Sequence, residues 1–208
     1  CSSDLDKFVQ CPDEIYVNEK KVSEEICKSL VLNETSNTIK LVWSNEITNA
    51  AYMFSGTNIE EIDFSYFNSS LVTNMNHMFS DCKNLTSINF SNINTSLVES
   101  MENLFYSCPL LTSFDLSTFN TSSVKSMKYM FNKCTKVTSL DLSYFDTSQV
   151  TSMNGMFRQG NFNILNLSNF NASMVTNMNY MFSICNQFLL FWPGCAGAVL
   201  GLCIIRHL

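Results

Sequence analysis

The side chains best suited to chemistry in this chain are carboxylates, amides and hydroxyls that recur at a fixed spacing. Serines flank them two residues away, as Ser139 and Ser143 flank one of the aspartates. The acidic and amide members follow one another at intervals of 26, 26, 26 and 25 residues: Asp63, Asn89, Asp115, Asp141 and Asn166. If the elements that carry them are stacked, Asp115 and Asp141 lie about 5 Å apart and attract a cation. The pattern predicts a surface that binds lysine or arginine side chains of a protein, with a calcium site or solvated polar residues without a binding role as the alternatives.

Catalytic motifs are missing from the sequence. The two histidines, His77 and His207, stand in no recognisable motif, and the chain has no G-x-S-x-G, phosphate loop or H-E-x-x-H. Its serines and aspartates recur with the repeat instead of placing a base beside a nucleophile. We therefore expect a protein that is not an enzyme and that has no cofactor and no resident metal.

Four cysteines share one position of the repeat: Cys82, Cys108, Cys134 and Cys185. Stacked positions point their Cβ atoms the same way, which disfavours disulfide bonds between them. Glycine, at Gly56 and Gly160, takes this position elsewhere, as is typical of a site that accepts only a small residue. The sequence favours a ladder of free, buried thiols, with disulfides or metal ligands as the alternatives.

Three further cysteines, Cys1, Cys11 and Cys27, lie in an acidic N-terminal segment, where one disulfide remains possible. The chain begins at Cys1, so this residue is either a processed, acylated terminus or the end of a fragment, and the sequence does not decide between the two.

The repeat itself has two halves. In the first half, Val124, Met127, Met130 and Phe131 have the spacing i, i+3, i+6 and i+7, which is typical of one face of a helix. The preceding Asn120-Thr121-Ser122 is typical of a helix N-cap. The Met-Phe or Leu-Phe pair that ends this half recurs every 25 or 26 residues: Met53-Phe54, Met78-Phe79, Leu104-Phe105, Met130-Phe131, Met156-Phe157 and Met181-Phe182.

The second half alternates apolar and polar residues, as Leu140 and Leu142 do, which predicts a strand with one buried face. The predicted parallel strands lie near residues 62–64, 88–90, 114–116, 140–142 and 165–167. One short helix and one strand cannot bury their apolar faces alone, so the units must stack. The fold class expected from this pattern is α/β: a right-handed leucine-rich-repeat solenoid of five to six strand–helix coils, each of 25–26 residues.

The full phrase L-T-S-L-D-L-S-x-F-[DN]-T-S-x-V-x-x-M-x-x-M-F-x-x-C resembles the BspA-like surface-protein repeats, and its L-x-x-L-x-L core is the strand signature of leucine-rich repeats. The resemblance runs from Ile39 to about Phe188, although Phe145 takes the usual asparagine position. It implies a secreted or surface-anchored, non-enzymatic protein that binds other proteins, for instance in adhesion. A structural spacer or stalk of a larger surface protein is the alternative.

Net charge and the composition of the two ends of the chain bear on its partners and its location. The 208 residues carry a net charge of −6 without a cluster of lysine or arginine, which argues against a nucleic-acid partner. We expect an acidic flanking segment over residues 1–38, the repeats over 39–187 and an apolar tail over 188–208. Phe188 to Ile205 contains no charge, so the tail is a membrane span, an edge strand with an apolar cap or a truncated end. The expected location is extracellular or on the cell surface, with possible membrane anchorage through this tail.

Overall fold

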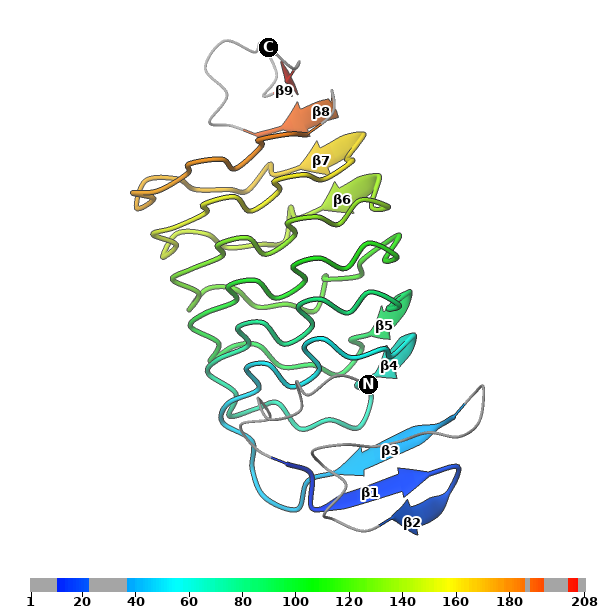
Figure 1. Cartoon of the computed structure of the whole chain (residues 1–208). Helices are drawn as coiled ribbons and strands as arrows, with labels where there is room; N and C mark the ends of the chain where they lie inside the picture. The colour runs from blue at the N-terminus through cyan, green and yellow to red at the C-terminus, as the bar shows by residue number, and fades with distance from the viewer. Residues whose placement is uncertain (1–10, 23–36, 186–187, 193–201, 206–208) are drawn as a thin grey trace.

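The computed structural model describes residues 11–22, 37–185, 188–192 and 202–205. Figure 1 shows successive repeats lying in layers one above another, with a small sheet of the first described strands at one end of the stack. The strands are β1 (Glu14–Val17), β2 (Lys20–Val22), β3 (Ile39–Val42), β4 (Glu61–Asp63), β5 (Ser87–Asn89), β6 (Ser139–Asp141), β7 (Ile164–Asn166), β8 (Phe188–Phe191) and β9 (Leu202–Ile205).

The expectation of a right-handed α/β leucine-rich-repeat solenoid of strand–helix coils is wrong. Within the ranges that the structure describes, the regular elements are short strands and none is a helix. The segments expected to be helices consist of turns, and Asn120 caps one of these turns by accepting a hydrogen bond from the Ser122 N–H at 3.1 Å.

Hydrogen bonding along these segments explains why no helix forms. The amides of Met130 and Asn132 bond back by three residues, to the carbonyls of Met127 and Tyr129. The alternate amides leave the segment, and that of Phe131 donates to Met156 O in the next repeat at 2.9 Å. An α-helix needs every such amide to bond four residues back. The apolar spacing of three and four residues therefore arises from consecutive turns.

Backbone dihedral angles confirm this arrangement. Tyr129 has φ +53° and Lys133 has φ +62°, and the equivalent residues of the other repeats also lie in the left-handed region, as His77 and Asp81 do. A single left-handed residue interrupts a right-handed helix. Each repeat contains two of them, and the chain turns there instead of winding further.

Four of the five predicted strands are present, each beginning one residue earlier than expected. β4 pairs with β5, and β6 pairs with β7, in parallel and in register. β7 pairs with β8 in parallel, whereas β8 pairs with β9 in antiparallel. The fifth predicted strand, at 114–116, does not form, and Figure 1 shows no arrow between β5 and β6. There Phe114 replaces the isoleucine or leucine of the other repeats, and its ring packs between Phe105 and Phe131.

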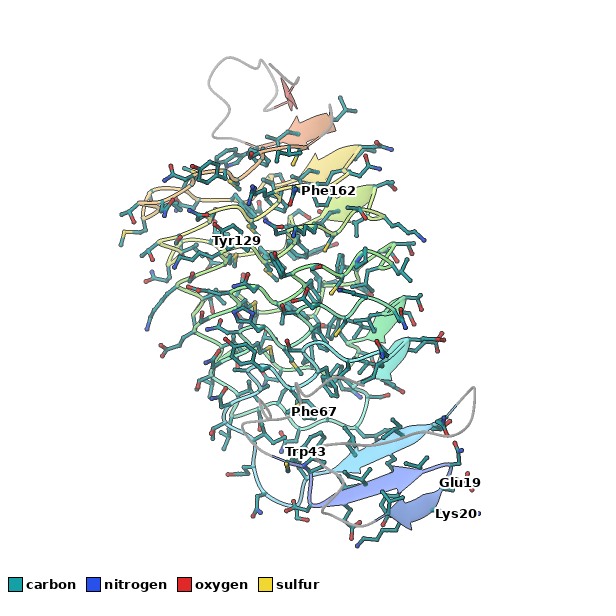
Figure 2. The ribbon with its side chains drawn as sticks, viewed as in Figure 1. Glu19, Lys20, Trp43, Phe67, Tyr129 and Phe162 are labelled. Atoms are coloured by element: carbon teal, nitrogen blue, oxygen red, sulfur yellow. The ribbon has the colours of Figure 1, made fainter. Side chains whose placement is uncertain are left out.

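At the N-terminal end, β1 pairs in antiparallel with β2 and β3, in the order β2-β1-β3. The β1–β2 turn has positive φ at Asn18 and Glu19, as two-residue hairpins require. Figure 2 places this turn at the free end of the sheet, while Trp43 and Phe67 lie where the sheet meets the repeats. The rings of Trp43 and Phe67 meet edge to face at 5.7 Å, which joins the sheet to the core.

A column of stacked phenylalanine rings forms the centre of the core. Neighbouring rings are nearly parallel, with centroids 5.5 to 5.9 Å apart. The column consists of Phe54, Phe79, Phe105, Phe131, Phe157 and Phe182. Met130 and its equivalents are buried beside it. The predicted apolar stripe is thus confirmed, although turns carry it.

The prediction of free, buried thiols is confirmed for the four repeat cysteines. Each thiol donates to a carbonyl of the preceding repeat; Cys134 Sγ, for example, lies 3.2 Å from Phe105 O. Burial raises the pKa of Cys82 to about 11 and that of Cys134 to about 12. In the first repeat the equivalent residue is Thr57, not Gly56, since Thr57 follows Phe54 by three residues as Cys82 follows Phe79. Thr57 Oγ1 donates to Phe54 O of its own repeat at 2.7 Å.

The described residues cover only part of the two ends of the chain, so they test the predictions for these ends only in part. Cys11 is disulfide-bonded, whereas Cys1 and Cys27 lie outside the described residues. The apolar tail lies partly outside them as well, and β8 and β9 are its described strands. In the described part of the chain, no helix has the length and apolar character needed to cross a membrane.

Candidate functional site

The predicted polar residues lie on the exposed side of strands β4 to β7, which we call the strand face. Asp63 of β4 is the register partner of Asn89 of β5, and Asn89 Nδ2 donates to Asp63 Oδ1 at 3.0 Å. Asp141 of β6 is likewise the partner of Asn166 of β7. The structure therefore brings these four residues together in two pairs.

Every member of this column also forms a local turn. The carboxylate of Asp141 accepts a hydrogen bond from the Ser143 N–H at 2.9 Å. The same contact joins Asp63 to Ser65, Asn89 to Ser91, Asp115 to Ser117 and Asn166 to Ser168. These are Asx turns, in which a side-chain oxygen takes up the amide two residues on and ends the strand. The regular Asx-x-Ser spacing thus has a structural use that the sequence analysis did not foresee.

Hydrogen bonds also set the ionisation of two of the carboxyls. The Ser65 hydroxyl and amide, together with the Asn89 amide, lower the pKa of Asp63. The Ser117 hydroxyl, 2.6 Å from Asp115 Oδ1, and the Ser117 amide lower the pKa of Asp115. Both side chains therefore remain anionic at neutral pH and present fixed negative charge on the strand face.

The column is interrupted at its middle. Asp115 is exposed but belongs to the stretch without a strand, between the two-stranded sheet of β4 and β5 and the sheet that begins with β6. The backbone pairing that would hold Asp115 opposite Asp141 is thus missing from the strands described. The expected acidic pair stays a prediction, and the calcium alternative has no support from this geometry.

A shallow hollow of about 400 Å³ lies between β6 and β7 on the strand face. It brings together three predicted residues, Ser139, Asp141 and Asn166, and adds Ile164 and Ser168. Ile164 is 42% exposed, so the hollow combines hydroxyl, carboxylate and amide groups with an apolar side chain. Such a combination suits contact with a protein surface better than the binding of a bare ion.

Two tyrosines beside the column were missed by the sequence analysis. Tyr66 is 99% exposed and Tyr144 is 64% exposed, and each directly follows the serine of an Asx turn. The equivalent residues elsewhere are Asn92, Thr118 and Asn169. Tyrosine at a position that is otherwise polar was the signal in the sequence that could have identified these two residues. Exposed tyrosine is enriched at protein interfaces because its ring is rigid and amphipathic.

The described residues form no metal site. No three histidine, cysteine, aspartate or glutamate side chains of the described ranges gather as a metal ion would require. His77 lies among the turns, where its ring stacks on Tyr52 at 4.5 Å and its Nε2 lies 3.2 Å from Asn103 Nδ2. His207 lies outside the described residues.

The family described as a Mycoplasma protein of unknown function, DUF285, matches residues 27–139 and 111–190. The chain belongs to this family. The matched DUF285 residues include all the repeats that carry the strand face. No curated protein and no solved structure matches the chain.

Proposed function

We propose that this DUF285 chain is a non-enzymatic recognition module that binds a protein ligand through its strand face. The observation that carries the proposal is the exposure of Tyr66 and Tyr144 beside an ordered polar column. A surface with aromatic anchors and preorganised polar groups loses little conformational entropy on binding. The Asx turns supply that order, because each fixes a polar side chain to its own backbone.

We further propose an extracellular or cell-surface location and a role in adhesion. The disulfide bond of Cys11 supports an oxidising compartment. The resemblance of the repeat phrase to BspA-like surface proteins supports adhesion, although the strand–helix architecture of that comparison does not hold here. The anionic carboxylates of Asp63 and Asp115 favour a partner that presents lysine or arginine.

An attachment assay tests this function. Purified, labelled chain is added to extracellular matrix deposited by cultured cells, with and without prior trypsin treatment of the matrix. We expect saturable attachment that trypsin abolishes, and a decrease at low salt for the double variant Asp115→Asn, Asp141→Asn. Two results would favour a structural spacer instead. In one, the chain does not attach to the matrix. In the other, trypsin treatment leaves attachment unchanged and the double variant attaches as well as the unmodified chain at every ionic strength.

A further inference from the structure

A second groove lies on a different surface of the molecule. It is formed by the turn segments on either side of the Met-Phe or Leu-Phe pairs, and it has a volume of about 740 Å³. We call it the turn-face groove. Its lining side chains come from five successive repeats and include Tyr52, His77, Tyr106, Tyr129, Asn132 and Arg158. At about 5 Å per layer, the groove extends for roughly 20 Å along the stack.

Two columns of side chains border this groove. One column holds the left-handed residues, with Tyr52 stacked on His77 and Tyr129 folded over Gly155. A Cβ atom at Gly155 would lie only 2.2 Å from Tyr129 Cε1, so glycine is required beneath that ring. Tyr129, labelled in Figure 2, lies away from the edge formed by β4 to β7. The strand face and the turn-face groove are therefore separate surfaces.

The second column holds the residues that follow the Met-Phe or Leu-Phe pairs, among them Asn132 and Arg158. Asn132 is only 1% exposed, and its Oδ1 has no hydrogen-bond partner. Arg158 Nε, one repeat further on, is also buried without a partner. Leaving a buried acceptor and a buried donor unpaired costs free energy, so both atoms favour a ligand that can satisfy them.

A hydroxyl group can satisfy both atoms, because it donates one hydrogen bond and accepts others. It would donate to Asn132 Oδ1 and accept from Arg158 Nε, whereas a carboxylate or phosphate could only accept. The two residues hold equivalent positions in adjacent layers, which the bond from Lys133 N to Arg158 O joins at 3.0 Å. Arg158 is half-buried, and its guanidinium carbon lies 5.9 Å from the centre of the Tyr180 ring. Binding therefore requires this long side chain to rotate so that both atoms reach the groove surface.

The rest of the lining suits a ligand rich in hydroxyl groups. Asp81 and Arg158 contribute one carboxylate and one guanidinium to the lining, so neither sign predominates among these fixed charges. Tyrosine rings offer apolar faces and a polar tip, which match the alternating C–H and O–H groups of a sugar ring. An extended peptide is disfavoured because the turn amides, such as that of Tyr129 to Asn154 O at 2.9 Å, are already bonded to the next repeat.

From these observations we infer that the turn-face groove binds an extended carbohydrate chain, with a sugar hydroxyl bridging Asn132 and Arg158. This site is independent of the proposed protein-binding strand face. The tyrosine rings of the two columns would hold the sugar rings, and Asn132 Oδ1 and Arg158 Nε would fix the position of one hydroxyl group.

Isothermal titration calorimetry with four soluble probes tests the inference: chitohexaose, cellohexaose, maltohexaose and a hyaluronan octasaccharide. We expect at least one to bind more tightly than about 1 mM. The variants Asn132→Ser and Arg158→Ser should each weaken that binding by about tenfold or more. Serine occupies the equivalent position at Ser55, Ser80 and Ser183, so these variants should fold. The control Asp141→Asn, on the strand face, should bind like the unmodified chain.

Two outcomes would overturn the inference. In one, none of the four probes binds more tightly than about 1 mM. In the other, a probe binds but both serine variants retain its full affinity. If the variants prove unstable, NMR on the unmodified chain decides instead: the side-chain signals of Asn132 and Arg158 must shift on addition of the bound probe, and unshifted signals would place the ligand elsewhere.

Discussion

Replacement of Thr95 by valine tests the way in which neighbouring repeats are joined. Thr95 is 1% exposed, and its hydroxyl both donates to Asn120 O and accepts from Asn120 N, each at 2.8 Å. Valine has nearly the same shape but no hydroxyl, so both backbone groups of Asn120 lose a partner. Each loss costs about 1–3 kcal/mol when the group stays buried. Asn120 is itself exposed and water can partly compensate, so we expect a total of about 2–4 kcal/mol.

Thr95→Ser is the matched control, because serine occupies the equivalent position at Ser69 and Ser69 Oγ accepts from Asn94 N at 2.7 Å. This change keeps the hydroxyl and removes one methyl group, at a cost of about 1 kcal/mol. Urea unfolding followed by tryptophan fluorescence gives both free energies, with unchanged m-values as a check on the comparison. If Thr95→Val costs no more than Thr95→Ser, the reasoning about these buried hydroxyls is wrong.

Of four further predictions, one concerns the core, two concern the thiols and one concerns the contact between Tyr129 and Gly155. Met130→Asp places a charge at a fully buried position and should lower the free energy of unfolding by several kcal/mol. Thr135→Asp, at an exposed position, should lower it by less than about 1 kcal/mol. Equal decreases in the melting temperature of the two variants would contradict the assigned core. Cys82, Cys108 and Cys134 should react slowly with iodoacetamide at pH 7.5 in the native chain and rapidly in denaturant, and a Cys108–Cys134 bridge found by mass spectrometry would refute the thiol ladder. Burial raises the folded pKa of Cys82 to about 11 and that of Cys134 to about 12, so these thiols make a contribution to stability that is fully present below the unfolded thiol pKa of about 8.5 and is lost as the pH rises towards the folded values. Urea titrations at pH 7.5 and 10.5 should therefore show a larger fall in the free energy of unfolding for the unmodified chain than for a Cys82→Ala, Cys134→Ala variant; equal falls would contradict the burial of these thiols. Gly155→Ala should destabilise the chain through its contact with the Tyr129 ring, and Tyr129→Ser should partly restore stability in the double variant; additive losses would contradict the packing of that ring.

The sequence predicted the period, the buried stripe and the position of the strands, because each depends on the alternation of apolar and polar residues. Met130, Phe131 and Leu140 are all buried as expected. The thiol ladder was predictable for a related reason: equivalent positions of stacked repeats point in parallel, which leaves Cys108 and Cys134 unable to bond.

The helices were wrongly predicted because consecutive turns of three residues place apolar side chains at the same spacing as a helix does. The signal that separates the two is the residue type at the left-handed positions. Asn103 and Gly155 favour positive φ, yet Tyr52, Tyr129 and Tyr180 do not, so the pattern is visible only after the structure aligns them.

The candidate site was partly predictable. The column of Asp63, Asn89, Asp141 and Asn166 follows directly from the repeat, and strand pairing brings it together as two pairs. The break at Asp115 coincides with the larger Phe114 ring, which packs between Phe105 and Phe131, and the spacing of the repeat does not reveal it. Tyr66 and Tyr144 do not follow from the repeat, because the residue after each Asx turn varies and is Asn92, Thr118 or Asn169 elsewhere.

The most direct test of the recognition function is attachment of the double variant Tyr66→Asn, Tyr144→Asn to matrix deposited by cultured cells. Asparagine occupies the equivalent position at Asn92 and Asn169, so the fold should be retained. Met174→Ser is the control, since Met174 is 52% exposed and lies outside the strands. We expect the tyrosine variant to lose about tenfold or more in affinity, as two interface anchors would give, and the control to lose none. Equal attachment of the tyrosine variant and the unmodified chain would contradict a protein-binding strand face.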